Sequence, residues 1–163
     1  MIRSAELKDF ADIVKIYNHY VLNSHATFEI DPISVDDMMN RVQKIQHAFN
    51  LPWIVLVIEN QIVGYAYATQ WKPREAYLQT AEVSVYLEKN ATGNGYGRLL
   101  YQELIERLKH LRLHAILAGI SLPNDASVKL HESLGFKKVG QLKEVGKKFD
   151  RWIDVGYWEL IFE

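Results

Sequence analysis

Three glycines occupy alternate positions in the segment Ala91-Thr-Gly-Asn-Gly-Tyr-Gly-Arg98, where an alternating strand pattern gives way to a helical one. Glycine adopts a positive φ at little cost and lets a ligand approach the main chain closely. Successive N–H groups of such a turn, aimed by the first turn of a helix, suit phosphate oxygens. The segment therefore predicts a phosphate-bearing ligand, while the glycine spacing alone leaves a merely flexible turn as the alternative.

This turn does not match two common phosphate-binding loops. No Gly-Lys-Ser/Thr follows it, which excludes a nucleotide triphosphatase loop. Counted from Gly93, the third glycine of a dinucleotide-binding fingerprint would fall at Arg98, and no acidic residue ends a strand about 20 residues later. A different phosphate ligand is expected.

Two titratable residues flank the turn in chain order. Glu82 lies on the preceding strand pattern, on the face opposite the valines, where a carboxylate can take up a proton. His131 lies on a short helical segment before Gly135-Phe136, and histidine suits proton transfer near neutral pH. Their structural alternatives are a solvated strand glutamate and a helix histidine with a satisfied ring hydrogen bond.

A loop before the Glu82 strand carries Lys72, Arg74 and Tyr77. A fork-shaped guanidinium beside an ammonium suits a carboxylate or phosphinate group. These three residues therefore predict recognition of an anionic group, and the alternative is a solvated charged loop.

Apolar periodicity predicts the elements that position these residues. Strand patterns cover, in order, residues 2–3, 53–58, 62–69, 80–87, 115–120, 137–142 and 152–162. Helical patterns follow four segments: one capped by Ser4 that runs to Val21, one capped by Ser34 that runs to Ile45, one after Gly97 that runs to Leu111, and one over 123–134. This order of elements predicts a mixed α/β sheet.

The composition limits the class of protein. A chain of 163 residues predicts a single domain spanning 1–163. A formal charge of -1 argues against a nucleic-acid partner, and the absence of cysteine excludes disulfides and thiolate chemistry. No metal site is expected. With neither a signal-peptide pattern after Met1 nor an apolar run that could span a bilayer, we expect a cytoplasmic protein without a membrane partner.

Several of these motifs together resemble the GNAT superfamily of N-acetyltransferases. The resemblance rests on Glu82-Val-Ser-Val-Tyr-Leu87, the glycine turn, Asn124-x-x-Ser127 and His131-Glu-Ser-Leu-Gly-Phe136. The coenzyme loop of the superfamily reads Gln/Arg-x-x-Gly-x-Gly/Ala, and its first position here is Thr92, a departure. The resemblance implies an α/β fold with a mixed, largely antiparallel sheet, flanked by helices and splayed at the acetyl-CoA site.

A more specific resemblance, to the phosphinothricin and methionine-sulfoximine N-acetyltransferases, runs over nearly the whole chain. It is carried by Tyr17-Asn-His-Tyr20, Trp71-Lys-x-Arg-x-Ala-Tyr77, Gly119-Ile-x-x-Pro-Asn-Asp125 and Asp154-Val-Gly-Tyr-Trp158. This resemblance implies transfer of an acetyl group from acetyl-CoA to the α-amine of a small amino acid or analogue, by a homodimer.

The resemblance also implies roles for individual residues. Glu82 would act as the base and His131 as a general acid or proton relay. Acetyl-CoA would contact Val85, Tyr86, Leu87, Gly93, Asn94, Gly95, Tyr96, Gly97, Arg98 and Asn124, with backbone N–H groups near Val85 to Leu87 polarising the thioester carbonyl. The acceptor substrate would contact Phe28, Lys72, Arg74 and Tyr77.

Two alternative functions stay open. The acceptor could be a protein N-terminus, a polyamine or an aminoglycoside, although cationic acceptors favour an acidic pocket over Lys72 and Arg74. The chain could instead be a non-catalytic acetyl-CoA-binding sensor. The Glu82→Gln variant separates the two classes, because an enzyme loses turnover while keeping its coenzyme affinity.

Overall fold

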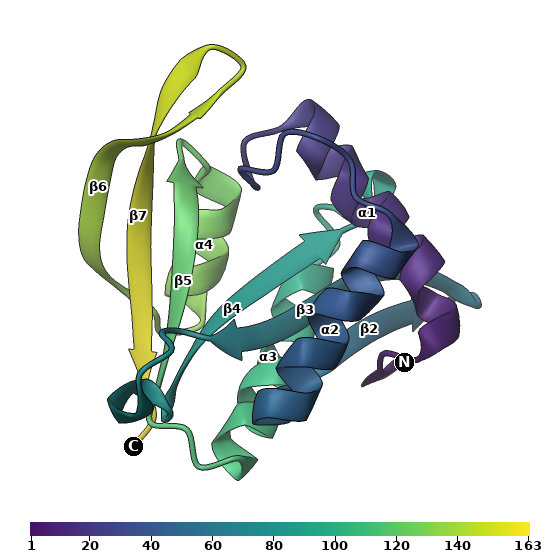
Figure 1. The fold of residues 1–163 in the computed structure, drawn as a ribbon, viewed down its shortest axis with the longest axis horizontal. Helices are drawn as coiled ribbons and strands as arrows, with labels where there is room; N and C mark the ends of the chain where they lie inside the picture. Colours follow the sequence, from purple (N-terminus) through teal and green to yellow (C-terminus); the bar gives the residue numbers. More distant parts are fainter.

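The computed structural model describes residues 1–163 and centres on a seven-stranded sheet in the order β1-β2-β3-β4-β5-β7-β6 (Figure 1). The strands are β1 (Ile2–Ser4), β2 (Trp53–Ile58), β3 (Gln61–Gln70), β4 (Thr80–Leu87), β5 (Ala115–Leu122), β6 (Lys137–Lys148) and β7 (Arg151–Ile161). Strands β4 and β5 pair in parallel, and all the other neighbours are antiparallel. The expectation of a mixed, largely antiparallel sheet is confirmed.

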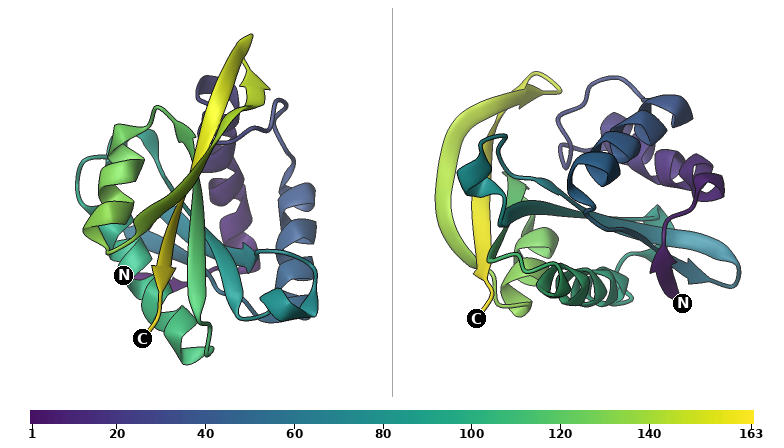
Figure 2. Two further views of the ribbon diagram at one scale, coloured as in Figure 1. Left: turned by 90° about the vertical axis from the view of Figure 1, so that its left-hand side faces the viewer. Right: turned by 60° about the horizontal axis from the view of Figure 1, so that its bottom comes forward.

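Helices cover both faces of this sheet. They are α1 (Phe10–Asn23), α2 (Val35–Phe49), α3 (Tyr96–His110) and α4 (Asp125–Ser133). Helices α1 and α2 pack on one face and α3 and α4 on the other (Figure 2). None of the helices is both long enough and apolar enough to cross a membrane, and nowhere do three potential metal ligands gather.

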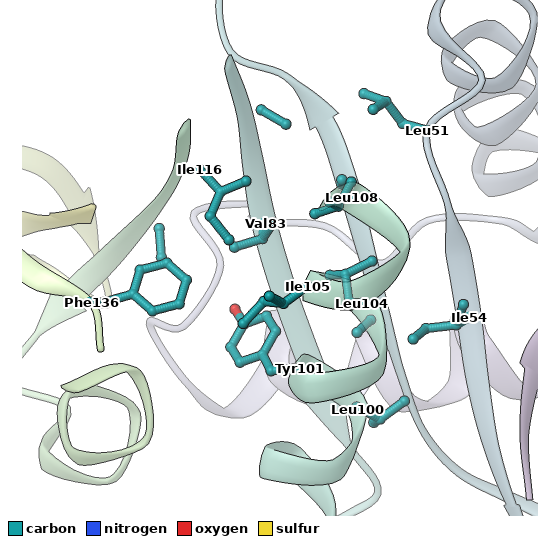
Figure 3. Close-up of a cluster of buried hydrophobic side chains, with 14 of the residues drawn as sticks. Leu51, Ile54, Val83, Leu100, Tyr101, Leu104, Ile105, Leu108, Ile116 and Phe136 are labelled. Atoms are coloured by element: carbon teal, nitrogen blue, oxygen red, sulfur yellow. The ribbon is translucent and has the colours of Figure 1, made fainter. Parts of the chain in front are cut away.

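Helix α3 follows the predicted apolar stripe. Leu100, Leu104 and Leu108 are fully buried against the sheet, and Figure 3 shows them directed from the helix toward the strands. Three- and four-residue spacing places such side chains on one helix face. The helix ends at His110, so Leu111, which the pattern included, lies just beyond it and is 41% exposed.

The predicted start of the first helix is wrong. Ser4 belongs to β1, and α1 begins at Phe10 after a single 3-10 turn. The carboxylate of Asp9 accepts a hydrogen bond from the backbone N–H of Glu6 at 2.7 Å and ion-pairs with Arg3 at 2.6 Å. These bonds hold the chain in an extended entry before the helix. The Ser34 capping box of α2 is confirmed.

The last two strands form a longer hairpin than the sequence predicts. Strand β6 continues to Lys148 instead of ending at Leu142, because the pairing with β7 resumes after an irregularity between Leu142 and Gly146. That irregularity breaks the alternating pattern on which the prediction depended. The tip reaches the loop between α1 and α2 (Figure 1), where the buried Lys148 donates a hydrogen bond to the carbonyl oxygen of Thr27 at 2.8 Å.

Candidate active site

Strands β4 and β5 separate in the middle of the sheet. They pair only from Thr80 to Glu82, opposite Ala115 to Leu117, and diverge beyond that point (Figure 1). The expected splay is therefore confirmed. Glu88 donates its backbone N–H to the carbonyl oxygen of Val63 on the β3 side. Because backbone groups alternate sides along a strand, those of Val85 and Leu87 face the opening.

A cleft of about 630 Å³ occupies the opening and continues over the glycine turn to α4. It is lined by nine of the ten residues expected to contact acetyl-CoA: Val85, Tyr86, Leu87, Gly93, Gly95, Tyr96, Gly97, Arg98 and Asn124. Asn94 does not line it. Its side-chain amide donates to the carbonyl oxygens of Ala91 and Thr92, each at 3.3 Å, and so braces the turn from within.

The glycine turn fits a phosphate group. Gly93 and Gly95 have φ values of 81° and 76°, a conformation that favours glycine. The N–H groups of Tyr96, Gly97 and Arg98 make no backbone hydrogen bond, and Gly95 caps α3 without a side chain. These free donors point out of the N-terminus of α3, where the helix dipole favours an anion.

The departure at Thr92 leaves this arrangement intact. The Thr92 hydroxyl donates a hydrogen bond to the carbonyl oxygen of Lys89 at 3.2 Å, and Thr92 lines the cleft. The guanidinium of Arg98 reaches across to α4 and donates to the hydroxyl of Ser133 at 2.9 Å. These two hydrogen bonds join the turn to the segment before it, at Lys89, and to α4, at Ser133.

A second, smaller cavity of about 310 Å³ adjoins the cleft on the face covered by α1 and α2. It is lined by His25, Ala26, Phe28, Glu82, Gly119, Ser121, Leu142, Val145, Val155 and Tyr157. Ala26, Gly119 and Ser121 also line the larger cleft, so the two spaces meet at β5. We refer to the smaller one as the acceptor cavity.

Glu82 is the single carboxylate of the acceptor cavity. Burial raises the pKa of Glu82 above its usual range, and the positive charge of Lys72 partly opposes this shift. Gly119 permits the close approach of the carboxylate, since a Cβ at that position would lie 3.3 Å from Glu82 Oε1. A carboxylate with a raised pKa beside an acyl-donor cleft suits general-base chemistry.

His131 is 3% exposed and lines the cleft from α4. Its Nδ1 lies 2.7 Å from the carbonyl oxygen of Ser127, which can only accept, so Nδ1 carries the ring proton. Nε2 therefore accepts a hydrogen bond from the hydroxyl of Tyr101 at 3.0 Å. Burial lowers the pKa of His131, so the neutral ring predominates at neutral pH.

Tyr101 also lines the cleft, although the sequence analysis did not select it. It lies in the apolar stripe of α3, beside Leu100 (Figure 3). From the sequence pattern alone, a residue in this stripe is expected to be part of the hydrophobic core. Its position one helical turn after Gly97 was the available signal, because residues four apart share a helix face.

The loop residues expected to contact the acceptor do not all reach its cavity. Phe28 lines it, whereas Lys72, Arg74 and Tyr77 do not. Lys72 Nζ lies 5.3 Å from the ring centre of Trp71, and that ring packs edge-on against Tyr157 of the cavity wall. Lys72 thus lies behind the wall. Three further lining residues, His25, Ser121 and Tyr157, had no predicted role. His25 and Ser121 belong to no motif, whereas Tyr157 lies in the Asp154-Val-Gly-Tyr-Trp158 motif, which was the available signal.

Comparisons with known proteins agree with this geometry. A model of the acetyltransferase (GNAT) domain matches residues 2–156. A phosphinothricin N-acetyltransferase from Streptomyces viridochromogenes is 36% identical over 162 residues, which cover 99% of this chain and 87% of the relative. An L-methionine sulfoximine/L-methionine sulfone acetyltransferase from Salmonella typhimurium is 37% identical over 161 residues, which cover 98% of this chain and 92% of the relative.

A solved structure extends the similarity to three dimensions. The crystal structure of a GNAT superfamily phosphinothricin acetyltransferase from Sinorhizobium meliloti, in complex with acetyl-CoA, matches with a TM-score of 0.96 and 34% identity. The match covers 99% of this chain and 88% of that one.

Proposed function

The chain belongs to the GNAT acetyltransferase family, and on this basis we propose that it acetylates the α-amine of a small amino acid or analogue, of the phosphinothricin, methionine sulfoximine or methionine sulfone type. Acetyl-CoA supplies the activated acetyl group as a thioester. The observation that carries the proposal is the junction of the two spaces at β5, with Glu82 on the acceptor side.

Glu82 is the proposed base. An amino acid's α-amine is mostly protonated at neutral pH and must lose a proton before it can attack a carbonyl carbon. Burial weakens the acidity of Glu82, which makes its carboxylate a better proton acceptor than an exposed glutamate. The positive charge of Lys72 acts in the opposite direction and lowers the pKa of Glu82, which favours the ionised carboxylate.

His131 and Tyr101 are the proposed route for returning a proton to the leaving sulfur. The neutral ring of His131 holds its proton on Nδ1, so the group that can donate into the cleft is the Tyr101 hydroxyl. When the Tyr101 hydroxyl turns from Nε2 to the leaving sulfur and gives up its proton, the free lone pair on Nε2 of His131 would take up a proton from water in the cleft and pass it to the Tyr101 oxygen, which restores the hydroxyl. In this scheme His131 relays a proton to Tyr101 and does not donate directly to the sulfur.

Backbone donors on β4 are the proposed site for the negative charge that develops on the carbonyl oxygen. The N–H groups of Val85 and Leu87 face the opening, whereas the N–H of Tyr86 faces β3. Tyr20 donates its hydroxyl to the carbonyl oxygen of Leu87 at 2.7 Å and so holds this end of β4 in place. Fixed donors of this kind stabilise a developing oxyanion.

Acceptor recognition is proposed to involve Phe28 as part of the apolar wall, and Lys72, Arg74 and Tyr77 of the loop before β4, which do not line the cavity themselves. Phe28 lines the cavity together with Leu142, Val145 and Val155. An apolar wall opposite a carboxylate suits an amino acid with a medium-sized side chain.

A thiol-release assay tests the proposal. Purified protein is given acetyl-CoA with methionine sulfone, methionine sulfoximine, phosphinothricin, the common amino acids, polyamines and lysine-rich peptides. We expect release with the free amino acids and its loss in the Glu82→Gln variant. Acetylation of peptides or polyamines alone would disprove the acceptor assignment, and coenzyme binding without release from any acceptor would favour a sensor.

Assembly and location are part of the same proposal. We propose that the enzyme forms a homodimer and works in the cytoplasm, where acetyl-CoA is available. Exposed apolar side chains along the β6–β7 hairpin, Val139, Phe149 and Trp152, support burial of this surface between two copies. Light scattering of the purified protein measures the mass, and a monomer at micromolar concentration contradicts the dimer.

A further inference from the structure

The acceptor cavity has an uneven distribution of charge. Among its ten lining residues, Glu82 is the one acid and His25 is the one side chain that can carry a positive charge. A free amino acid brings both an ammonium and a carboxylate into this space. A buried carboxylate without a charged or hydrogen-bonding partner is costly. The cavity must therefore offer a hydrogen-bond donor to the carboxylate of the bound amino acid.

His25 is held in one orientation by Ser121. The hydroxyl of the buried Ser121 donates to the backbone carbonyl oxygen of His25 in a short hydrogen bond. The Ser121 oxygen also lies 3.0 Å from His25 Nδ1, and since its own proton is already used, it accepts the Nδ1 proton. The loop after α1 is thereby tied to β5 at both the main chain and the ring.

This arrangement leaves Nε2 of His25 without a protein partner. In the imidazolium form both ring nitrogens donate, so Nδ1 keeps its bond to Ser121 while Nε2 can donate to an anion. His25 can therefore supply a charge-assisted hydrogen bond inside the cavity.

Strand β5 contacts both the acid and the histidine of the cavity. Gly119 lies against the carboxylate of Glu82, and Ser121, two residues farther along the same face of the strand, holds His25. Two residues span about 6.6 Å of a strand. Glu82 and His25 therefore contact β5 at neighbouring positions on one face, and both line the same cavity, where a single small zwitterion can meet an anionic and a cationic group at once.

We propose that His25 binds the α-carboxylate of the acceptor while Glu82 receives its α-ammonium, so that the cavity selects free α-amino acids over amines that lack the carboxylate. This inference rests on the proposed function and adds the group that recognises the acceptor. It differs from the sequence-based expectation that Lys72 and Arg74 hold the carboxylate, since neither lines the cavity.

The test compares methionine sulfone with its α-carboxamide, which keeps the amine and the side chain but loses the negative charge. Wild-type enzyme should prefer the acid, and His25→Ala should raise the KM for the acid by about tenfold while leaving the KM for the amide within about twofold. The kcat at saturation should change little. The matched control is His110→Ala at the exposed end of α3, which should leave both KM values unchanged.

Two measurements distinguish a specific loss of acceptor binding from misfolding of the variant. Calorimetry should give the same affinity for acetyl-CoA in wild type and His25→Ala. In the wild-type protein, magnetic resonance of the histidine rings should show the His25 signal moving on addition of methionine sulfone and not on addition of the amide. Ser121→Ala, which frees the ring, should show a smaller preference for the acid.

The possible results separate the two proposals. If wild type acetylates acid and amide equally well, or if His25→Ala weakens both alike, the inference about His25 is wrong while the acetyltransferase proposal stands. If the preference for the acid disappears in Lys72→Met or Arg74→Met and survives in His25→Ala, the carboxylate binds at the loop and the inference is overturned. If the wild-type protein binds acetyl-CoA but acetylates no amino acid, the proposed function itself is wrong.

Discussion

Nε2 of His131 accepts a hydrogen bond from the hydroxyl of Tyr101 at 3.0 Å, and the two side chains are 3% and 1% exposed. They come from α4 and α3, thirty residues apart in the chain, and both line the cleft. Burial lowers the pKa of the histidine and raises that of the tyrosine far above its usual range. At neutral pH the pair is therefore uncharged and holds two protons, on Nδ1 and on the hydroxyl.

Replacing Tyr101 with phenylalanine should lower kcat by about 10²-fold or more, the size expected for loss of a positioned proton donor. Affinity for acetyl-CoA should hold, because the ring remains and packs as before. Single-turnover rates and calorimetry measure the two quantities. The double variant with His131→Gln should be scarcely slower than Tyr101→Phe, since residues that act as a unit are not additive. Fully additive effects would contradict the relay.

The Glu82→Gln variant should lose about 10²-fold or more in kcat, as expected for removal of a general base. The pKa of Glu82 is raised, so wild-type kcat should fall as the pH drops through a value above that of an ordinary glutamate. A pH profile of kcat measures this limb. Glu59→Gln, in the exposed turn between β2 and β3, is the matched control and should behave as wild type.

The same residue predicts a change in stability. A carboxyl whose folded-state pKa lies above its unfolded value favours folding most at low pH, and this contribution is lost as the pH rises through the folded pKa. Removing the charge should therefore raise the Tm of Glu82→Gln at neutral pH and leave it unchanged at pH 4. Calorimetric scans at both pH values check this, and a lower Tm at neutral pH contradicts it.

Lys72→Met should move the acid limb of the kcat profile to higher pH. The positive charge of Lys72 lowers the pKa of Glu82 against the effect of burial, so its removal leaves burial unopposed. The pH profile of the variant measures the shift. An unchanged limb would show that Lys72 does not act on the base.

Gly95→Ala should weaken acetyl-CoA binding by about tenfold and destabilise the fold by about 1–2 kcal/mol, the cost of a left-handed conformation for a residue with a Cβ. Nothing lies within 4 Å of a Cβ at this position, so the effect isolates backbone conformation from steric overlap. Gly140→Ala in β6 is the matched control, because it too has open space but no positive φ. Calorimetry and thermal unfolding measure both effects, and equal behaviour of the two variants would contradict the prediction.

Asp9→Asn should destabilise the protein by about 1–3 kcal/mol, because it removes the charge from a buried, bidentate partner of Arg3. The guanidinium of Arg3 lowers the pKa of Asp9, so the stabilisation is present above the unfolded pKa and is lost as the pH falls through the folded one. Urea titrations at pH 7 and pH 3 measure the difference. The control is Lys8→Met, whose ion pair with Glu6 is exposed, so that its loss should leave the free energy of unfolding nearly unchanged.

Local patterns were sufficient for most of the sheet and for the coenzyme side of the site. The alternation from Ala81 to Leu87 assigned each side chain of β4 to its correct face, because a strand repeats every two residues. The glycine turn predicted the free N–H groups at the start of α3. Both its backbone conformation and its position before a helix depend only on residues that are adjacent in the chain. Where the signal was not periodic, as at Ser4 and in the second half of β6, the predicted boundaries were wrong.

Folding decided what lines the acceptor cavity and which groups exchange protons. Ser121 and His25 are 96 residues apart, and Tyr101 and His131 are 30 apart, so no local spacing relates them. Both pairs flank the opening that forms where β4 and β5 stop pairing after Glu82. On one face the loop after α1 meets β5 and the β6–β7 hairpin, and on the other α3 packs beside α4. The sequence alone determined which residues can bind a phosphate or take up a proton, through their chemistry and their neighbours along the chain. Only the tertiary structure determined which of them share one enclosed space, since burial and long-range contacts set both the pKa of Glu82 and the partner of each buried donor.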